Sequence, residues 1–408
     1  MLKYNSQRPD SMNHGDIAWM IASTALVMLM VPGVGLFYAG MVRKKNVVSM
    51  ITLSIISVIV ACVVWIIYGY SLAFSGDVSG FVGNLGKAFL NGVSITSSDP
   101  IPEMLFMLYQ MMFAGVTLAI ITSAMAERTR VSSFILFGAL WLTFVYIPFA
   151  HWLWGNGFLA KIGALDFAGG MVVHVSSGFG ALALAFLLGK RYGYGEHSIE
   201  PHSIPLTLIG LAMLWFGWFG FNGGSALQAN EVAVNAVVVT FIASCFAGLT
   251  WMIVSWVKGK PGSLGIASGI VAGLASITPA AGFVDVFGAV VIGVVAGILC
   301  FIALDFRIKK GIDESLDAWA IHGIGGAMGS IALGIFADPS ISGHAGLLYG
   351  NAGLLVSQII AVLVTVAYAF AVTFAIGKIT DIVMPMRVTI EEEYVGLDIS
   401  QHGEVGYA

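Results

Sequence analysis

Long uncharged stretches dominate the chain and alternate with short segments that carry most of its charges. A helix needs roughly 20 apolar residues to cross a bilayer core of about 30 Å. Eleven stretches of about this length are bounded by charged or turn-forming residues, which predicts an all-α membrane protein with eleven transmembrane helices. The predicted spans are residues 17–42, 47–74, 103–126, 131–151, 167–189, 204–224, 232–257, 264–280, 283–304, 318–337 and 350–378.

The basic residues predict how these helices are oriented, because Lys and Arg in short loops resist crossing the membrane. Alternate loops carry most of them: Arg43, Lys44, Lys45, Arg128, Arg130, Lys190, Arg191, Lys258, Lys260, Arg307, Lys309 and Lys310. We therefore expect this side to be cytoplasmic. An odd number of spans then places the N-terminal segment, residues 1–16, outside and the tail, residues 379–408, inside.

The order of the spans predicts an inverted repeat. Five helices in residues 17–190 are followed by a polar connector, residues 191–203, five further helices in residues 204–337 and one extra helix, residues 350–378. Halves with an odd number of helices face opposite ways, and transporters built in this manner bind their substrate near the midplane, where the halves meet. The 51 glycines recur at spacings that let helix backbones approach closely, as at Gly178.

Composition agrees with the membrane prediction and excludes other classes. The chain is 58% hydrophobic and 10% charged, with a mean hydropathy of +0.92, so lipid must replace water around much of it. A net charge of −4 and scattered basic residues exclude a nucleic-acid partner. Cys62, Cys245 and Cys300 lack metal-ligand spacing, and we expect them to be buried packing residues. With no phosphate-binding glycine loop, HExxH or Ser/His/Asp set, we expect neither an enzyme nor a cofactor.

Two histidines lie inside apolar spans, His174 in the fifth and His322 in the tenth. Each occupies the last helix of its half, so an inverted repeat would bring them to related positions near the centre. Ionisable residues in a membrane are costly and usually mark a transport pathway, which favours a pore-lining pair over two structural residues. Neutral imidazoles can both donate and accept hydrogen bonds. A metal site is the rival interpretation, weakened because zinc normally needs at least three protein ligands.

An aspartate precedes each histidine, and a tryptophan lies just outside the fourth span. Asp166 lies eight residues before His174, and Asp317 lies five before His322. Asp166 either attracts a cation or caps the fifth span by accepting its free N–H groups, and we favour the cap slightly. The indole face of Trp154 is a candidate cation site, although tryptophan near the end of a span is more often an interfacial anchor.

Several short motifs occur in an order that is found in a known family. They are Pro32-Gly33 through Phe37-Tyr38, Arg43-Lys44-Lys45-Asn46, Ala126-Glu127-Arg128, Asp166-Phe167-Ala168-Gly169-Gly170 through His174, Phe219-Gly220-Phe221-Asn222, Gly396-Leu397-Asp398 and His402-Gly403-Glu404. Together they resemble the Amt/Mep/Rh ammonium transporters, on the Amt side. The resemblance runs from about residue 16 into the tail.

The resemblance implies specific roles for several residues. They are His174, His322 and Trp218 for the pore wall, Trp154 and Ser225 for an external cation site, Phe113 and Phe221 for a stacked gate that closes the outer pore, and Asp166 for an acidic residue near the outer site. It also implies a homotrimer with one pore per subunit, and control at the cytoplasmic face by a PII-type nitrogen regulatory protein.

A charged ion is costly to move through a dry pore, so recognition and passage are best separated. We expect NH4+ to be recruited by Trp154 and Ser225 and to lose a proton at the gate, and NH3 to pass the histidines. An ammonium sensor that signals through its tail, or an Rh-type gas channel, is the alternative. We expect the tail to be ordered against the cytoplasmic face, with its basic partners supplied by the loop of residues 307–310.

Overall fold

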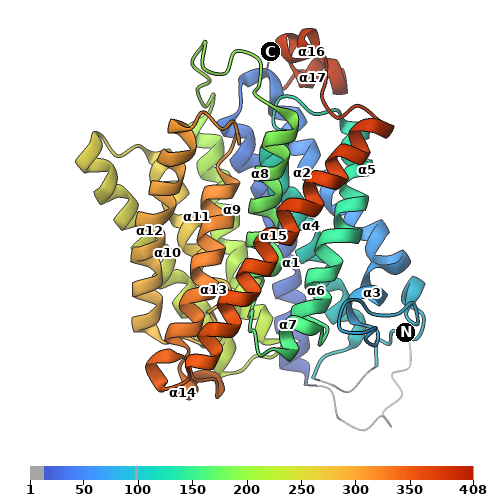
Figure 1. Cartoon of the computed structure of the whole chain (residues 1–408), viewed down its shortest axis with the longest axis vertical. Helices are drawn as coiled ribbons and strands as arrows, with labels where there is room; N and C mark the ends of the chain where they lie inside the picture. The colour runs from blue at the N-terminus through green and yellow to red at the C-terminus, as the bar shows by residue number, and fades with distance from the viewer. Residues whose placement is uncertain (1–12, 97–99, 408) are drawn as a thin grey trace, which may run out of the picture.

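Helices make up the fold. The computed structural model describes residues 13–96 and 100–407, and within these ranges the only β pairings are isolated bridges. Long helices stand side by side, with two short helices of the tail at one end and the short helices α7 (Phe158–Lys161) and α14 (Pro339–Ser342) at the other (Figure 1). We call these the tail end and the opposite end. The all-α prediction is confirmed, while most of the predicted N-terminal segment lies outside the described residues.

Ten helices of the described residues are long and apolar enough to cross a membrane, some of them made of two helical pieces. Their main elements are α1 (His14–Met41), α2 (Val47–Val64) with α3 (Tyr70–Phe74), α4 (Glu103–Ile121), α5 (Val131–Trp141) with α6 (Ile147–Trp154), α8 (Ser176–Leu188), α9 (Ile204–Gly223), α10 (Glu231–Lys258), α12 (Val286–Lys309), α13 (Gly325–Phe336) and α15 (Ala352–Val383). The chain is therefore a multi-pass membrane protein.

The eighth predicted span corresponds to a shorter helix, α11 (Ser263–Ile277). Its 15 residues cover only about 22 Å at 1.5 Å per residue. It is apolar and mostly buried against α10, α12 and α13. A complete eleventh crossing and the orientation of the bundle stay predictions. The short helices α7 (Phe158–Lys161) and α14 (Pro339–Ser342) lie in loops at the opposite end (Figure 1).

Small residues allow the close helix contacts that the glycine spacing predicts. Along the α1–α9 contact, a Cβ added to Gly210 would stand 2.3 Å from the backbone N of Phe37. About two and three turns further on, a Cβ on Gly217 or Gly220 would stand 2.3 Å and 2.6 Å from side-chain atoms of α1. Of the three cysteines, all free, Cys300 is buried, while Cys62 and Cys245 are only half-buried, which corrects the expectation for those two.

Among the described residues, four membrane-spanning segments contain a stretch of π-helix, in which the backbone hydrogen bond joins residue i to residue i+5. Two stretches join helical pieces, Trp65–Gly69 between α2 and α3 and Leu142–Tyr146 between α5 and α6. The other two begin the fifth and the tenth spans, Gly170–Val175 before α8 and Trp319–Ile324 before α13. Both predicted pore histidines lie in these last two stretches.

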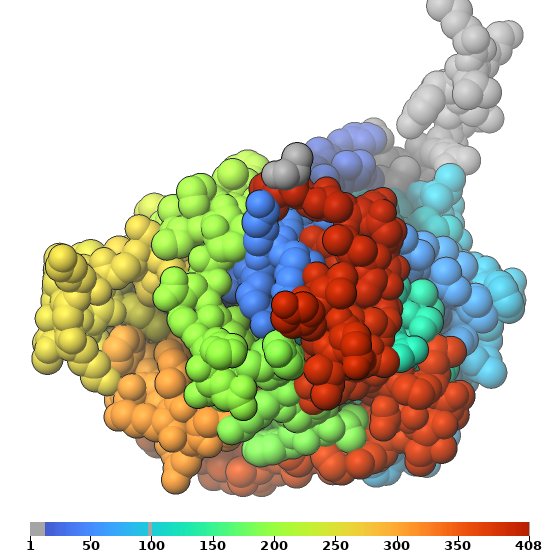
Figure 2. Space-filling view, turned by 90° about the horizontal axis from the view of Figure 1, so that it is seen from above, coloured from blue at the N-terminus to red at the C-terminus, as the bar shows by residue number. Residues whose placement is uncertain are grey.

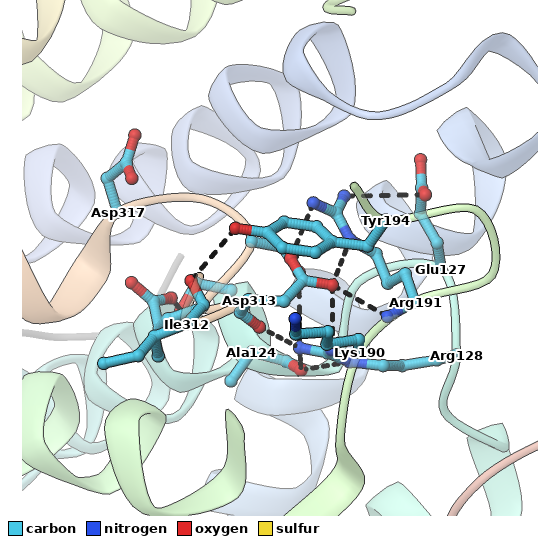
Figure 3. A network of polar contacts seen from close by, with 12 residues as sticks. Ala124, Glu127, Arg128, Lys190, Arg191, Tyr194, Ile312, Asp313 and Asp317 are labelled. Carbon is cyan, nitrogen blue, oxygen red and sulfur yellow. Dashed lines mark hydrogen bonds and ion pairs between the residues drawn. The ribbon is translucent and has the colours of Figure 1, made fainter. Parts of the chain in front are cut away.

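A buried ionic network fixes three loops at the tail end (Figure 3). Arg128 is fully buried and donates to the carbonyl oxygens of Ala124 at 2.9 Å, Asp313 at 2.8 Å and Gly189. The Asp313 carboxylate pairs with Arg128 at 3.2 Å and Arg191 at 2.8 Å. Burial lowers the pKa of Arg128 to about 10. Burial also opposes ionisation of Asp313, but the two guanidinium groups outweigh it and hold the pKa of Asp313 below its usual value.

The tail is ordered against this face, as predicted. It contains α16 (Ile390–Val395) and α17 (Leu397–His402), and lies over the tail end beside the α1–α2 loop (Figure 2). Asp398 accepts a bond from the backbone N of Ser49 at 2.8 Å, and the buried Glu393 accepts one from Arg387 at 2.6 Å. Arg387 in turn donates to the carbonyl oxygen of Leu188 at 2.8 Å. The tail therefore docks on the loops after α1 and α8.

The predicted basic partners of the tail are wrong. Arg307 pairs with Asp317 at 2.5 Å, and Lys309 pairs with Asp305, one turn earlier in α12. The ammonium group of Lys310 lies over the ring of Phe306. These side chains are therefore engaged within their own region of the chain, because local partners lie within reach.

Candidate functional site

The structure brings His174 and His322 into direct contact in the buried centre of the bundle. Their Nδ1 atoms lie 3.1 Å apart, and their ring centroids are 5.1 Å apart. One ring must donate at Nδ1 and the other accept there, so the Nε2 atoms of two neutral rings have opposite roles. The Nε2 of His174 is buried and has no hydrogen-bond partner among the described residues. A small polar molecule would supply that partner.

Glycines explain how two histidine-bearing helices come this close. A Cβ on Gly178 would stand 2.2 Å from the backbone N of Gly323, the residue after His322. A Cβ on Gly326 would stand 2.8 Å from the Cβ of His174. The two backbones therefore cross with only hydrogen atoms between them.

Aromatic rings continue the line of the histidine pair. Phe113 of α4 and Phe221 of α9 stack at 4.2 Å between centroids, and both are buried. Phe221 also stacks on His174 at 5.9 Å, and Trp218 stacks on the same imidazole at 5.5 Å. The Nε1 of Trp218 donates to the hydroxyl of Thr278 at 2.9 Å, which fixes this indole. The phenylalanine pair predicted as the gate therefore lies directly against the histidine pair.

Trp154 and Ser225 both contact this gate and are partly exposed. The indole of Trp154 meets Phe113 edge-on at 5.9 Å and donates from Nε1 to the carbonyl oxygen of Asp166 at 2.8 Å. The hydroxyl of Ser225 donates to the carbonyl oxygen of Phe221 at 2.8 Å. Because the Ser225 proton is used in this bond, the Ser225 oxygen has lone pairs free to accept. That oxygen and the indole of Trp154 can together hold a small cation.

Asp166 is a helix cap. Its carboxylate accepts four backbone N–H bonds, from Gly169 at 2.9 Å, Gly170 at 2.6 Å, Met171 at 2.8 Å and Val172 at 3.1 Å. A carboxylate has about four lone-pair sites, and these bonds use them. The geometry therefore agrees with the capping interpretation, and Asp166 anchors the π-helical segment that carries His174.

Asp317 has a different role, although its place before His322 is similar. Its carboxylate pairs with Arg307, and it does not cap the second π-helical segment. Glu314 takes that place, accepting a bond from the backbone N of Trp319 at 3.1 Å and one from Ser123 at 2.6 Å. The Asp-then-His order in the sequence thus corresponds to two different arrangements of side chains.

An apolar cavity lies on the tail side of the histidine pair. It has a volume of about 20 Å³, and the residues that line it include Val34, Phe37, Leu214, Ile321 and His322. A space of this size holds about one water-sized molecule. Within the described ranges, no three or more His, Cys, Asp or Glu side chains gather where a metal ion could bind. The line of gate, histidines and cavity therefore suits a small neutral molecule.

Comparison with known proteins identifies the family. The model of the Ammonium Transporter Family matches residues 18–407. The chain belongs to the Ammonium Transporter Family. It is 67% identical over 396 residues to ammonium transporter Amt1 of Archaeoglobus fulgidus, covering 97% of this chain and 100% of that protein.

Solved structures agree with this assignment to the Ammonium Transporter Family. The structure of Mep2 from Saccharomyces cerevisiae superposes with a TM-score of 0.89 at 37% identity, covering 98% of this chain and 92% of that one. A protein described as a sensor Amt protein superposes with a TM-score of 0.89 at 30% identity, covering 95% of this chain and 98% of its own.

Sequence reasoning missed Tyr109, which contacts both phenylalanines predicted to form the gate of this member of the Ammonium Transporter Family. Its ring meets Phe113 edge-on at 4.9 Å, and its hydroxyl lies 2.9 Å from the carbonyl oxygens of Gly220 and Phe221. It also lies 3.3 Å from the hydroxyl of Ser225. Position alone could have indicated it, since Tyr109 precedes Phe113 by one helical turn.

Proposed function

We propose that this chain recruits NH4+ at Trp154 and Ser225, that the ion gives its proton to water on the exposed side of the Phe113–Phe221 gate, and that the remaining NH3 passes His174 and His322. Transport of ammonium across the cell membrane follows from membership of the family. The observation that carries the proposed route is the continuous contact from the stacked phenylalanines to the bonded histidine pair and on to the apolar cavity.

Physical chemistry supports a change of charge along this route. An indole face and acceptor oxygens attract a cation where water still reaches it. Beyond the gate, the lining is aromatic and aliphatic, and moving an unpaired charge into such surroundings costs many kcal/mol. A neutral NH3 can instead donate to or accept from the histidine nitrogens, and no described residue bonds to the Nε2 of His174.

The decisive experiment replaces His174 by leucine, which cannot form a hydrogen bond. Purified protein in proteoliposomes is pulsed with ammonium on a solid-supported membrane, and internal pH is followed in parallel. We expect the ammonium response to be lost in His174→Leu and kept in His344→Gln, a control on an exposed histidine of another loop. Unchanged flux and selectivity in His174→Leu would remove the pore role.

The wild-type response distinguishes the forms of transport. A current that depends on ammonium means that charge crosses with the substrate. Internal alkalinisation without current means that neutral NH3 passes alone. Silence in both assays would contradict transport and support the sensor alternative.

The same proposal covers the two repeats, the oligomeric state and the regulatory partner. We assign residues 17–190 and 204–337 to the two repeats, supported by a histidine-bearing π-helical segment in the last span of each. The family resemblance and the ordered tail support a homotrimer that binds a PII-type regulator at the tail end. Native mass spectrometry of the purified protein tests the trimer. Binding of a PII-type protein, with and without the residues after Arg387, tests the partner.

A further inference from the structure

A third buried histidine, His151, lies one helical turn before Trp154 in α6. Its side chain is fully buried. Its Nδ1 is 2.9 Å from the carbonyl oxygen of Ala73, and its Nε2 is 3.1 Å from Oδ1 of Asp77. Ala73 belongs to α3, and Asp77 to the loop that follows it. His151 therefore connects the end of the second span to the end of the fourth.

Both partners of this ring are hydrogen-bond acceptors. A backbone carbonyl has no proton to give, and hydrogen bonds from Lys161 and His151 lower the pKa of Asp77 to about 2. Oδ1 of Asp77 also accepts a bond from the backbone N of Gly80 at 2.7 Å. A neutral imidazole has one N–H and would turn a lone pair toward one of these oxygens. Only the doubly protonated ring donates to both.

The same histidine holds the turn that follows Trp154. Its carbonyl oxygen accepts bonds from the backbone N of Gly155 at 3.0 Å and of Gly157 at 2.9 Å. A Cβ on Gly155 would stand 2.2 Å from the carbonyl oxygen of Ala73 and 2.7 Å from Nδ1 of His151. The end of α6 is therefore built directly against the imidazole.

We propose that His151 is a positioning residue for the ammonium-recruiting site, an imidazolium that clamps the end of α6 to Ala73 and Asp77 and so fixes the Trp154 indole. This inference rests on the proposed role of Trp154. Charge-assisted hydrogen bonds are about twice as strong as neutral ones, so the charged ring holds the turn more firmly than a neutral side chain of similar size.

The surroundings of the ring are consistent with one positive charge. Asp77 faces it directly, and Lys161 of α7 reaches the other oxygen of Asp77. On the α3 side, Tyr70 donates to Glu103 at 2.8 Å, and Glu103 also pairs with Lys87. Asp77 is therefore the carboxylate that faces His151, and it shares its charge with Lys161.

The test compares affinity with maximal rate. In His151→Gln, one of the two bonds is lost, and we expect the KM for ammonium to rise about five- to ten-fold, the scale of one hydrogen bond, with the maximal rate nearly kept. Trp154→Leu is the reference and should raise KM by itself. The double variant should raise KM no further than Trp154→Leu, because both changes act on one site. His344→Gln is the control and should keep the wild-type KM.

A spectroscopic measurement tests the charge directly. In protein labelled with ¹⁵N-histidine in lipid at neutral pH, we expect an imidazolium signal that disappears in His151→Gln and in Asp77→Asn but persists in His344→Gln. Asp77→Asn should also raise KM, and it replaces His151→Gln if that variant does not fold.

The outcomes distinguish a failure of the proposed recruiting site at Trp154 from a failure of the positioning role of His151. An unchanged KM in Trp154→Leu overturns the proposed recruiting site and the role of His151 together. A raised KM in Trp154→Leu, with wild-type KM in His151→Gln and Asp77→Asn, overturns the positioning role alone. Reduced maximal rate and reduced folded protein at unchanged KM would show that His151 only stabilises the fold.

Discussion

Replacing Gly178 by alanine tests the helix crossing that brings the two histidines together. The new Cβ would stand 2.2 Å from the backbone N of Gly323 and 2.4 Å from its Cα, whereas ordinary contact begins at 3.4 Å. The backbones must therefore separate by about 1.2 Å at this point, since no side chain can rotate away. His322 precedes Gly323, so the 3.1 Å contact between Nδ1 atoms would open to about 4 Å, beyond hydrogen-bonding distance.

The expected cost follows from this geometry. Overpacking a well-packed interior costs about 1–3 kcal/mol, and contact with backbone on both helices places Gly178→Ala toward the upper part of that range. We expect a lower unfolding temperature and an ammonium response in proteoliposomes reduced at least about ten-fold, equivalent to 1.4 kcal/mol.

A matched control is Gly262→Ala, because a Cβ there meets nothing within 4 Å and its φ of −82° suits alanine. We expect near wild-type transport from it. Full transport at an unchanged unfolding temperature in Gly178→Ala would refute the argument that this crossing sets the histidine distance.

Three further changes test other parts of the structure. Asp166→Ala leaves four backbone N–H groups without their acceptor and should cost about 3–6 kcal/mol of folding free energy. Asp166→Asn keeps one accepting oxygen and should cost about half as much. Identical chemical unfolding curves for the two variants would contradict the capping role. Asp313→Asn leaves the buried Arg128 without its carboxylate, while Arg191 keeps only Glu127 at 3.5 Å, and should cost about 3–5 kcal/mol. The fold lowers the pKa of Asp313, so the stabilisation that its carboxylate gives is present above the unfolded pKa near 3.9 and is lost as the pH falls below that value. The unfolding temperature of the wild type should therefore fall in acid, and that of Asp313→Asn should lack this fall. Glu393→Gln weakens the bond from Arg387 and should speed proteolysis of the tail while the rest of the chain stays intact.

The histidine pair was predictable because two physical constraints act on it. Polar side chains are rare in apolar spans, so His174 and His322 stand out, and the order of spans places them in corresponding helices. Whether Asp166 caps or attracts a cation was open, since both roles need a carboxylate at the start of a helix. The four backbone bonds that it accepts are visible only in three dimensions.

Other features leave no clear trace in the sequence. Hydrophobicity does not distinguish an α-helical turn from a π-helical one, because both consist of apolar residues. The partners of Arg307 and of the tail depend on which loops meet at the tail end, and loop charges alone suggested the wrong pairing. The shortness of α11 was hidden because the apolar stretch continues past Ile277 into a buried turn.

The π-helical segment before α8 lets the pore absorb a change in chain length that an ordinary helix would transmit. Each residue turns an α-helix by about 100°, and a π-helical turn accommodates one extra residue. The backbone N of His174 bonds to the carbonyl oxygen of Gly169, five residues earlier. If one residue between Gly170 and Val173 were deleted, the same bond would span four residues, as in an α-helix, and the imidazole would keep its direction toward His322. A residue lost inside α8 would instead turn the segment before it by about 100° relative to the segment after it, so the effect of a lost codon depends on which of the two helical forms it falls in.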